Sequence, residues 1–175
     1  MDLVKKFAIR IILVITTVFI LVGCDQATKQ AAYKQLKDNN NSEIAGIVHL
    51  KYIENDGGML SLGSNLPDTV KFIIFILFVS VFLAILFIYI IKNQQEYFLK
   101  QFALILILSG GLGNLIDRVF NEGNVIDFIR VRLPLIENGI FNIADFYVTM
   151  GFIMLLLSLL AKQKVIRQET QRRGS

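Results

Sequence analysis

Asp127 and Asp145 are two carboxylates that could act together on a peptide bond. When two carboxylates are brought close, they cannot both ionise at little cost, so one of them keeps its proton. The ionised group can then remove a proton from water as a general base, and the protonated group can donate to a carbonyl oxygen as a general acid. The sequence predicts this division of roles if the fold brings the two side chains together.

Each of these aspartates also has a purely structural interpretation. Asn142 and Asp145 have the spacing of a helix N-cap and the third helical residue, a variant of the capping box. Capping and catalysis are compatible for Asp145, because the N-terminus of a helix stabilises an anion. Asp127 could instead be an exposed acid in a loop, although its neighbours Ile126 and Phe128 are apolar and argue against full exposure.

A second group of polar residues stands at the end of an apolar run. Asn114, Asp117 and Arg118 occupy positions i, i+3 and i+4, which share one face of a helix. They could be a terminal Asp–Arg pair whose arginine reaches the membrane surface. We favour a scaffold that orients the catalytic loop or holds a substrate backbone, because polar groups at membrane depth are costly and usually functional. The glycine-rich stretch 110–113 before them predicts close helix packing rather than a phosphate loop.

Two weaker signals lie earlier in the chain. Asp25 and Lys29 follow the first apolar run and could be an interfacial cap whose lysine reaches toward lipid headgroups. Asn55 and Gly57 fit a hairpin turn. Neither pair would indicate a site on its own.

The composition is that of a membrane protein. Of the 175 residues 54% are hydrophobic, Trp is absent, and the apolar residues form long blocks. The net charge of +4 comes from basic residues beside these blocks and at the C-terminus, which favours a membrane surface over nucleic acid as the partner. With one cysteine, Cys24, and one histidine, His49, an intrachain disulfide is excluded and a His/Cys metal site is not expected.

Four apolar segments are long enough to cross a bilayer as helices. They lie at about residues 7–25, 70–91, 97–116 and 143–161, and a basic tail follows at 162–175. The sequence therefore predicts a mainly α, polytopic membrane protein in which residues 1–175 form a single membrane-embedded domain. The long polar loops are 27–68 and 117–142. In the first we expect a loop at 34–42 and two short strands, at 47–53 and 59–62, in a small sheet on the membrane surface.

The first apolar run has an alternative interpretation. Its basic start and apolar middle resemble a cleavable signal, and Leu21-Val22-Gly23-Cys24 resembles a lipobox, the site at which bacterial lipoproteins are acylated and cut. We favour a first transmembrane helix, because three more apolar runs follow and a cleaved signal would not explain them.

The distribution of Lys and Arg predicts the orientation of the helices. The N-terminal segment, residues 92–100 and the tail carry ten of the 18 basic residues. Because basic residues are enriched on the cytoplasmic side, both termini should be cytoplasmic and both long polar loops should face outside. The polar candidates then gather near the outer surface: Asp25, Asn55, Asp117, Asp127 and Asp145.

Five motifs follow one another along the chain. They are Asp25-Gln26-x-Thr28-Lys29, Asn55-x-Gly57-x-x-Leu60-Ser61, Gly110-Gly111-x-Gly113-Asn114-x-x-Asp117-Arg118, Val125-x-Asp127-Phe128 and Phe141-Asn142-x-Ala144-Asp145. With these motifs the chain resembles the bacterial lipoprotein signal peptidases, also called signal peptidase II, from the first apolar run to the fourth. In one departure, the family usually has Phe in place of Leu60 and often Ala-Ala in place of Gly58-Met59, which bears on the shape of the substrate cradle.

The resemblance implies a fold, a reaction and a set of residues. The fold would be four transmembrane helices with a small extracytoplasmic β-cradle and a short extracytoplasmic helix. The activity would be that of an aspartic endopeptidase, without metal or cofactor, that cuts prolipoproteins before a diacylglyceryl-modified cysteine. By motif position, Asp127 and Asp145 would be the catalytic pair. The residues that bind substrate or support the site would be Asp25, Lys29, Asn55, Gly57, Asn114, Asp117, Arg118 and Asn142.

Partners and location follow from the same resemblance. The protein would act as a monomer on diacylglyceryl-modified prolipoproteins, in contact with membrane lipid and without nucleic acid. It would be a multi-pass protein of the bacterial cytoplasmic (inner) membrane with its active site at the outer face. Two rival hypotheses remain open. A proton-coupled transporter would need acids through the depth of the membrane. In a non-enzymatic scaffold the acids would be caps, and Asn replacements would be harmless.

Overall fold

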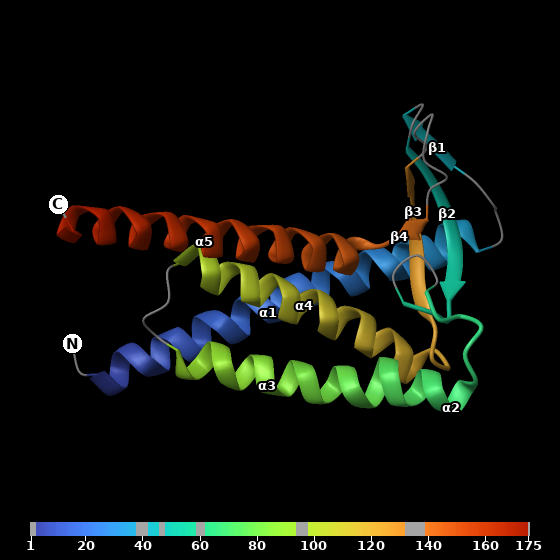
Figure 1. Ribbon diagram of the computed structural model, residues 1–175. Coiled ribbons are helices and arrows are strands. Elements are labelled where there is room, and N and C mark those ends of the chain that lie inside the picture. Colours follow the sequence, from blue (N-terminus) through green and yellow to red (C-terminus); the bar gives the residue numbers. More distant parts are fainter. Residues whose placement is uncertain are drawn as a thin grey trace.

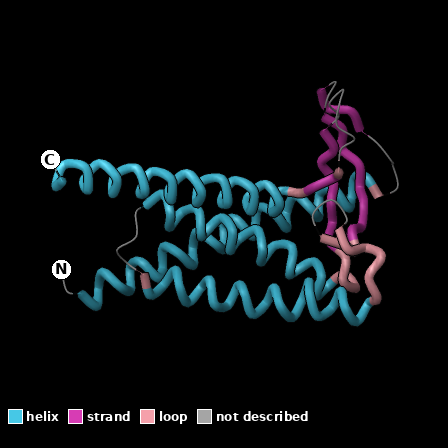
Figure 2. Tube along the Cα trace, viewed as in Figure 1, coloured by secondary structure: helices cyan, strands magenta, loops and turns pink. Residues whose placement is uncertain are grey.

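The computed structural model describes residues 3–37, 42–45, 48–58, 62–93, 98–131 and 139–174. Long helices pack along one another, and a small sheet stands at one end of them (Figure 1). Both chain termini lie at the opposite end. The strands and most of the described loop residues gather at the sheet end (Figure 2). The predicted meeting of the two polar loops at one end of the helices is confirmed.

Four helical segments make up the apolar part of the described chain. They are α1 (Leu3–Leu36), the continuous run of α2 (Asp68–Lys71), η2 (Phe72–Phe78) and α3 (Val79–Lys92), then α4 (Phe98–Phe120) and α5 (Ile143–Gly174). Each segment contains a stretch long and apolar enough to cross a membrane. The four predicted spans are therefore confirmed.

The helices have an apolar exterior as well as an apolar core. Phe19, Phe78 and Phe152 are 78%, 67% and 62% exposed, as suits side chains that face lipid tails rather than water. The centre of the bundle is α4, which packs against α1, α3 and α5. The core between α1, α3 and α4 consists of aliphatic side chains: Val14, Leu83, Leu86, Ile90, Leu104, Ile105 and Leu108.

The small sheet joins the two polar loops. Its four antiparallel strands lie in the order β1 (Ser42–Ala45), β2 (Val48–Asn55), β3 (Val125–Val131) and β4 (Ile140–Phe141). The predicted strand at 47–53 is confirmed as β2. It pairs with β1 and β3, and the register places Ile53 opposite Asp127. The returning strand expected at 59–62 falls on residues 59–61, outside the described residues, and Leu62 lies in a turn.

The first helix is longer than the sequence suggested. We expected it to end near residue 25 and a polar loop to begin at Ala27, but α1 continues to Leu36. No Gly or Pro interrupts the chain between Asp25 and Leu36, and most of these residues favour helix. Ala32 and Leu36 are also buried against Phe128 of the sheet, so the extension is held by packing.

Helix α4, the third of the predicted spans, also continues beyond its expected end at residue 116. Asp117 and Arg118 lie in its last turn, and it ends where Glu122 and Gly123 adopt positive φ values of 52° and 91°. The N–H of Gly123 donates to the carbonyl of Arg118 at 3.0 Å, which closes the helix end. The short separate helix implied by the family resemblance is not seen within the described ranges, where the only short α-helix, α2, runs directly into η2.

Candidate active site

Lys29 is a buried ammonium with three acceptors around it. Its Nζ lies 2.8 Å from Oδ2 of Asp25, 2.9 Å from Oδ2 of Asp117 and 2.9 Å from Oδ1 of Asn114. Three acceptors match the three N–H donors of an ammonium, so this buried charge is fully hydrogen-bonded. The expectation of an interfacial lysine that reaches headgroups is wrong, since Lys29 is only 1% exposed and points into the protein.

Asp25 joins the first helix to the start of the last one. Its Oδ1 accepts a hydrogen bond at 2.9 Å from the N–H of Ala144, in the first turn of α5, where helix N–H groups lack intrahelical partners. Gly113 permits this approach, because a Cβ there would lie 2.5 Å from Oδ2 of Asp25. A Cβ at Gly110 would collide with the carbonyl oxygen of Ala144. The predicted role of the glycines in close helix packing is confirmed.

Asp117 connects the buried lysine to the strand that carries Asp127. Its Oδ2 accepts a hydrogen bond at 3.0 Å from the N–H of Ile126 in β3. Its Oδ1 accepts one at 2.8 Å from Nε2 of Gln26, which also donates to the carbonyl of Gly113 at 3.1 Å. Asp117 therefore fixes the beginning of β3 relative to α1 and α4.

Asn142 caps α5 and contacts both candidate catalytic carboxylates. The N–H of Asp145 donates to Oδ1 of Asn142 at 2.9 Å, and the N–H of Asn142 donates to Oδ2 of Asp145 at 3.2 Å. This reciprocal pair confirms the predicted capping interaction. The Nδ2 of Asn142 donates to Oδ1 of Asp127 at 2.7 Å. One fully buried residue thus orients both carboxylates.

Asp127 is a buried acid in β3, and the exposed-loop interpretation of it is wrong. It is 2% exposed, and its Oδ2 accepts a hydrogen bond at 2.8 Å from Nδ2 of Asn55. Asn55 is itself held by the N–H of Gly57, which donates to its Oδ1 at 2.9 Å. Burial raises the pKa of Asp127 to about 6, against the hydrogen bond from Asn55 and with help from the negative charge of Asp145.

Asp145 lies in a more open environment at the N-terminus of α5, where it is partly exposed. Its Oδ1 accepts a hydrogen bond at 2.9 Å from Nδ2 of Asn114. The Oδ1 of Asn114 accepts from Lys29, which fixes the orientation of this amide. Two neighbouring carboxylates with such different surroundings meet the condition for one general acid and one general base.

Arg118 holds the turn that follows β2. Its Nη2 donates to the carbonyl oxygen of Gly57 at 2.7 Å, and its guanidinium lies 5.1 Å from the ring centroid of Phe75. With 9% of its surface exposed, Arg118 does not reach the membrane surface, so that alternative is wrong. The contact with Gly57 agrees with the expected scaffold, because it fixes the turn directly after Asn55, the last residue of β2.

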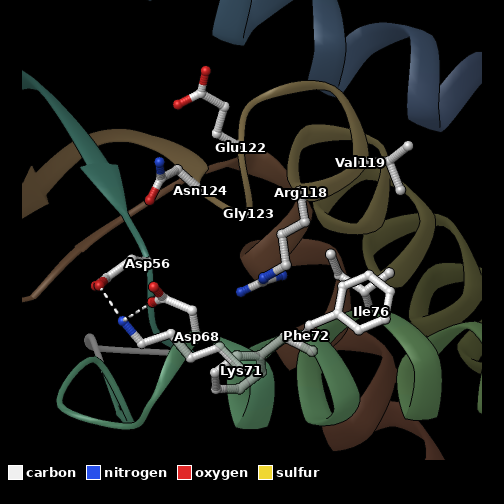
Figure 3. Close-up of a pocket in the computed structure, with 11 residues that line it drawn as sticks. Asp56, Asp68, Lys71, Phe72, Ile76, Arg118, Val119, Glu122, Gly123 and Asn124 are labelled. Atoms are coloured by element: carbon white, nitrogen blue, oxygen red, sulfur yellow. Dashed lines mark hydrogen bonds and ion pairs between the residues drawn. The ribbon is translucent and has the colours of Figure 1, made fainter.

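A cavity of about 620 Å³ opens beside Arg118, whose guanidinium points into it (Figure 3). On its polar side, Nζ of Lys71 lies 2.6 Å from Asp56 and 3.9 Å from Asp68. Phe72 lines the apolar side. The Nε of Arg118 is buried without a hydrogen-bond partner among the described residues. The cavity has room for a peptide segment.

The ten residues singled out from the sequence form one continuous hydrogen-bonded network. It runs through Lys29, Asp25, Asp117, Asn114, Asp145, Asn142, Asp127, Asn55, Gly57 and Arg118. Sequence reasoning missed Gln26, although it stands inside a quoted motif. It also missed the N–H of Ala144, since a backbone donor carries no sequence signal. Within the described part of the chain, no three His, Cys, Asp or Glu side chains could hold a metal ion together.

Comparison with known proteins identifies the family of this chain. The sequence model of the family described as "Signal peptidase (SPase) II" matches residues 17–161. The chain is 40% identical to a lipoprotein signal peptidase of Streptococcus thermophilus, over 79% of this chain and 86% of the relative. It is 35% identical to that of Borrelia duttonii, over 83% and 88%.

A solved structure gives the same result for the fold. A bacterial membrane enzyme determined by the in meso method superposes with a TM-score of 0.72 at 31% identity, over 86% of this chain and 89% of that one. The matched region, residues 17–161, includes every residue of the network around Asp127 and Asp145. The chain therefore belongs to the signal peptidase II family.

Proposed function

We propose that this protein is an aspartic endopeptidase that removes signal peptides from prolipoproteins. The observation that carries the proposal is the connection of Asp127 and Asp145 through Asn142. Members of the family are proteases, and the relatives compared above are named lipoprotein signal peptidase. A buried carboxyl beside a more accessible carboxylate supplies the acid and the base that hydrolysis of an amide needs.

In this mechanism Asp145 is the general base and Asp127 the general acid. The Asp145 carboxylate removes a proton from water, and the water oxygen attacks the carbonyl carbon of the scissile bond. Asp127 donates its proton to the carbonyl oxygen, which gives a neutral tetrahedral intermediate. The intermediate collapses when Asp145 gives the proton it took from water to the amide nitrogen, Asp127 takes a proton from a hydroxyl of the intermediate, and the C–N bond breaks, which restores both aspartates. Acid–base help of this kind is worth roughly 10²–10⁴-fold, and the rest must come from positioning in a site that excludes water.

We propose the bond before a diacylglyceryl-modified cysteine as the one that is cut. Such a substrate holds its signal helix and its acyl chains in the bilayer, with the scissile bond near the membrane surface. The carboxylates lie where the apolar helices meet the sheet, so a substrate entering laterally would place this bond beside them. Membrane lipid and the prolipoprotein would be the partners of a monomer.

The proposed location is the bacterial cytoplasmic membrane, with both termini inside and the site at the outer face. The basic residues support this orientation, because they are enriched at the end of the bundle that carries the termini. A test is Gln168→Cys in a Cys24→Ala background, labelled in intact cells. Reaction with an impermeant thiol reagent applied from outside would contradict the orientation, whereas reaction only after lysis supports it.

A proton-coupled transporter is less consistent with the distribution of acids. No Asp or Glu occurs between residues 69 and 95, so α3 has no carboxylate that could relay a proton across the bilayer. The network lies instead at one end of the helices. A relay through the membrane needs polar groups along its depth.

The decisive experiment is cleavage of a purified, diacylglyceryl-modified prolipoprotein by the full chain in detergent. We expect wild type to release the signal peptide and Asp145→Asn to release none. Glu54→Gln is the matched control, because Glu54 is an exposed acid at the same end of the bundle and does not line the cavity beside Arg118. Equal turnover by wild type and Asp145→Asn would refute the proposal. No turnover by correctly folded wild type would refute it as well.

A further inference from the structure

A second cavity, of about 520 Å³, lies between α1 and α4 at the end of the bundle that carries the termini. It is distinct from the proposed active site, because Arg10 and Asp25 on α1 are separated by 15 residues, or about 22 Å of helix. Its walls are mainly apolar, with Leu13, Val14, Phe98, Phe102 and Ile105 around it.

The polar end of this cavity is formed by Arg10 and Gln101. The carbonyl oxygen of Asn93 accepts a hydrogen bond from Nη2 of Arg10 at 3.0 Å and one from Nε2 of Gln101 at 2.6 Å. These contacts hold the guanidinium at one end of the cavity. A guanidinium carries five N–H donors in a planar fork, so it can take part in holding a phosphate group in addition to its contacts within the protein.

The apolar part extends from Arg10 toward the middle of the bilayer. Thr17 also lines the cavity, seven residues beyond Arg10 and so about 10 Å deeper along α1. Leu13 and Phe98 are 61% and 83% exposed, so the cavity is accessible from the lipid side. A cation at the interface above an apolar slot matches a molecule with an anionic head and a hydrocarbon chain.

The charge at this end of the protein selects the kind of lipid. The N-terminal ten residues, the stretch 92–100 and the tail 162–175 carry ten Lys and Arg against three acids, Asp2, Glu96 and Glu169. Lys6 lies one helical turn before Arg10 on the same face of α1 and adds to its positive charge. Basic pockets between transmembrane helices favour anionic over zwitterionic headgroups.

We propose that this cavity is a binding site for an anionic phospholipid of the bilayer. The phosphate is held by Arg10, with Gln101 beside it, and one acyl chain lies along Leu13, Thr17 and Phe102. The site is independent of the proposed peptidase activity. Its lipid links α1 to α4 at the end opposite the network of carboxylates.

The test measures lipid binding rather than cleavage. Full-length protein in detergent is titrated with dioleoylphosphatidylglycerol or dioleoylphosphatidylcholine, and bound lipid is counted by native mass spectrometry. We expect wild type to prefer the anionic lipid and Arg10→Gln to bind it about fivefold more weakly, the usual effect of one basic residue at an anionic surface. Lys5→Gln is the control, because Lys5 carries the same charge on another face of α1.

A second variant tests the apolar slot without changing any charge. Thr17→Phe fills the deep end of the cavity and should weaken binding of the anionic lipid while Arg10 remains. Equal losses in Arg10→Gln and Lys5→Gln would overturn the proposal in favour of diffuse surface charge. Unchanged binding of the anionic lipid by Thr17→Phe would overturn it too. If Arg10→Gln fails to fold, the Thr17→Phe result alone decides whether the cavity binds the lipid.

Discussion

The side-chain amide of Asn142 donates a hydrogen bond to Oδ1 of Asp127 at 2.7 Å. The same residue caps α5 through a reciprocal pair of hydrogen bonds with Asp145. The start of the last helix and the middle of β3 are thereby locked to each other through one side chain. The hydrogen bonds of Asn142 therefore help to fix the relative position of the two carboxylates.

Asn142→Ala should therefore reduce kcat strongly. Loss of the cap costs about 1 kcal/mol of stability, whereas a small displacement of reacting groups can cost about 10²-fold in rate. The hydrogen bond from Asn142 lowers the pKa of Asp127, so its removal should also move the alkaline limb of the pH–rate profile upward. Asn121→Ala is the control, because Asn121 follows α4 at the same end of the bundle and its Nδ2 has no hydrogen-bond partner among the described residues. A loss confined to KM would argue against a positioning role.

The two aspartates should behave as one unit. Asp127→Asn and Asp145→Asn each keep the size of the side chain but remove the acid–base function. We expect each single variant to abolish cleavage and the double variant to be little worse than either. Substrate binding should largely survive, because in the proposed function the signal helix and the acyl chains of the substrate would contact other parts of the protein. Cleavage and binding are measured in the same detergent, and substantial turnover by either single variant would remove the pair from the mechanism.

Asp127 should make stability depend on pH with a defined sign. Because burial raises its pKa from 3.8 to about 6, the folded state binds this proton more tightly than the unfolded state. The resulting stabilisation is fully present below about pH 3.8 and is lost as the pH rises through about 6, by about 3 kcal/mol at most. Wild type should lose thermal stability relative to Asp127→Asn across this window, and parallel curves would contradict the raised pKa.

Lys29→Met should be strongly destabilising. It would leave the carboxylates of Asp25 and Asp117 buried without their shared cation, which typically costs about 3–5 kcal/mol. Adding Asp25→Asn should recover part of the loss, because one of the two unpaired charges is then removed. Lys37→Met is the control, since its pair with Glu54 at 3.8 Å is half exposed and worth about 0–1 kcal/mol. Equal thermal unfolding of Lys29→Met and Lys37→Met would refute this account.

The sequence was sufficient for the spans, whereas the full membership of the network came from the family resemblance. A run of about 20 apolar residues has few alternatives to a transmembrane helix, and carboxylates or amides beside such runs need a reason. The sequence did not reveal that the side chain of Lys29 points into the protein rather than toward the membrane surface. The three acceptors of this lysine come from both α1 and α4, and local spacing cannot reveal a contact across 88 residues, from Lys29 to Asp117.

The strand around Asp127 was missed for a related reason. Val125 to Val131 mixes apolar and charged residues without strict alternation, because the buried face of β3 carries a carboxylate of the site. The alternation of apolar and polar residues that predicts a strand is lost where a buried position, here Asp127, carries a polar side chain of the candidate site. Gln26 was missed because a glutamine at the end of an apolar run is common, and its partners Asp117 and Gly113 become neighbours only in the fold.

The hydrogen bond between Asp25 and Ala144 spans 119 residues of sequence. During synthesis the first helix enters the bilayer long before the ribosome reaches the fourth. Asp25 therefore lacks its partner Ala144 until then, and the network around Asp127 and Asp145 is completed only when the last helix is inserted. Under the proposed function, a nascent or truncated chain would be inert toward neighbouring signal sequences, and proteolytic competence would coincide with the end of membrane assembly.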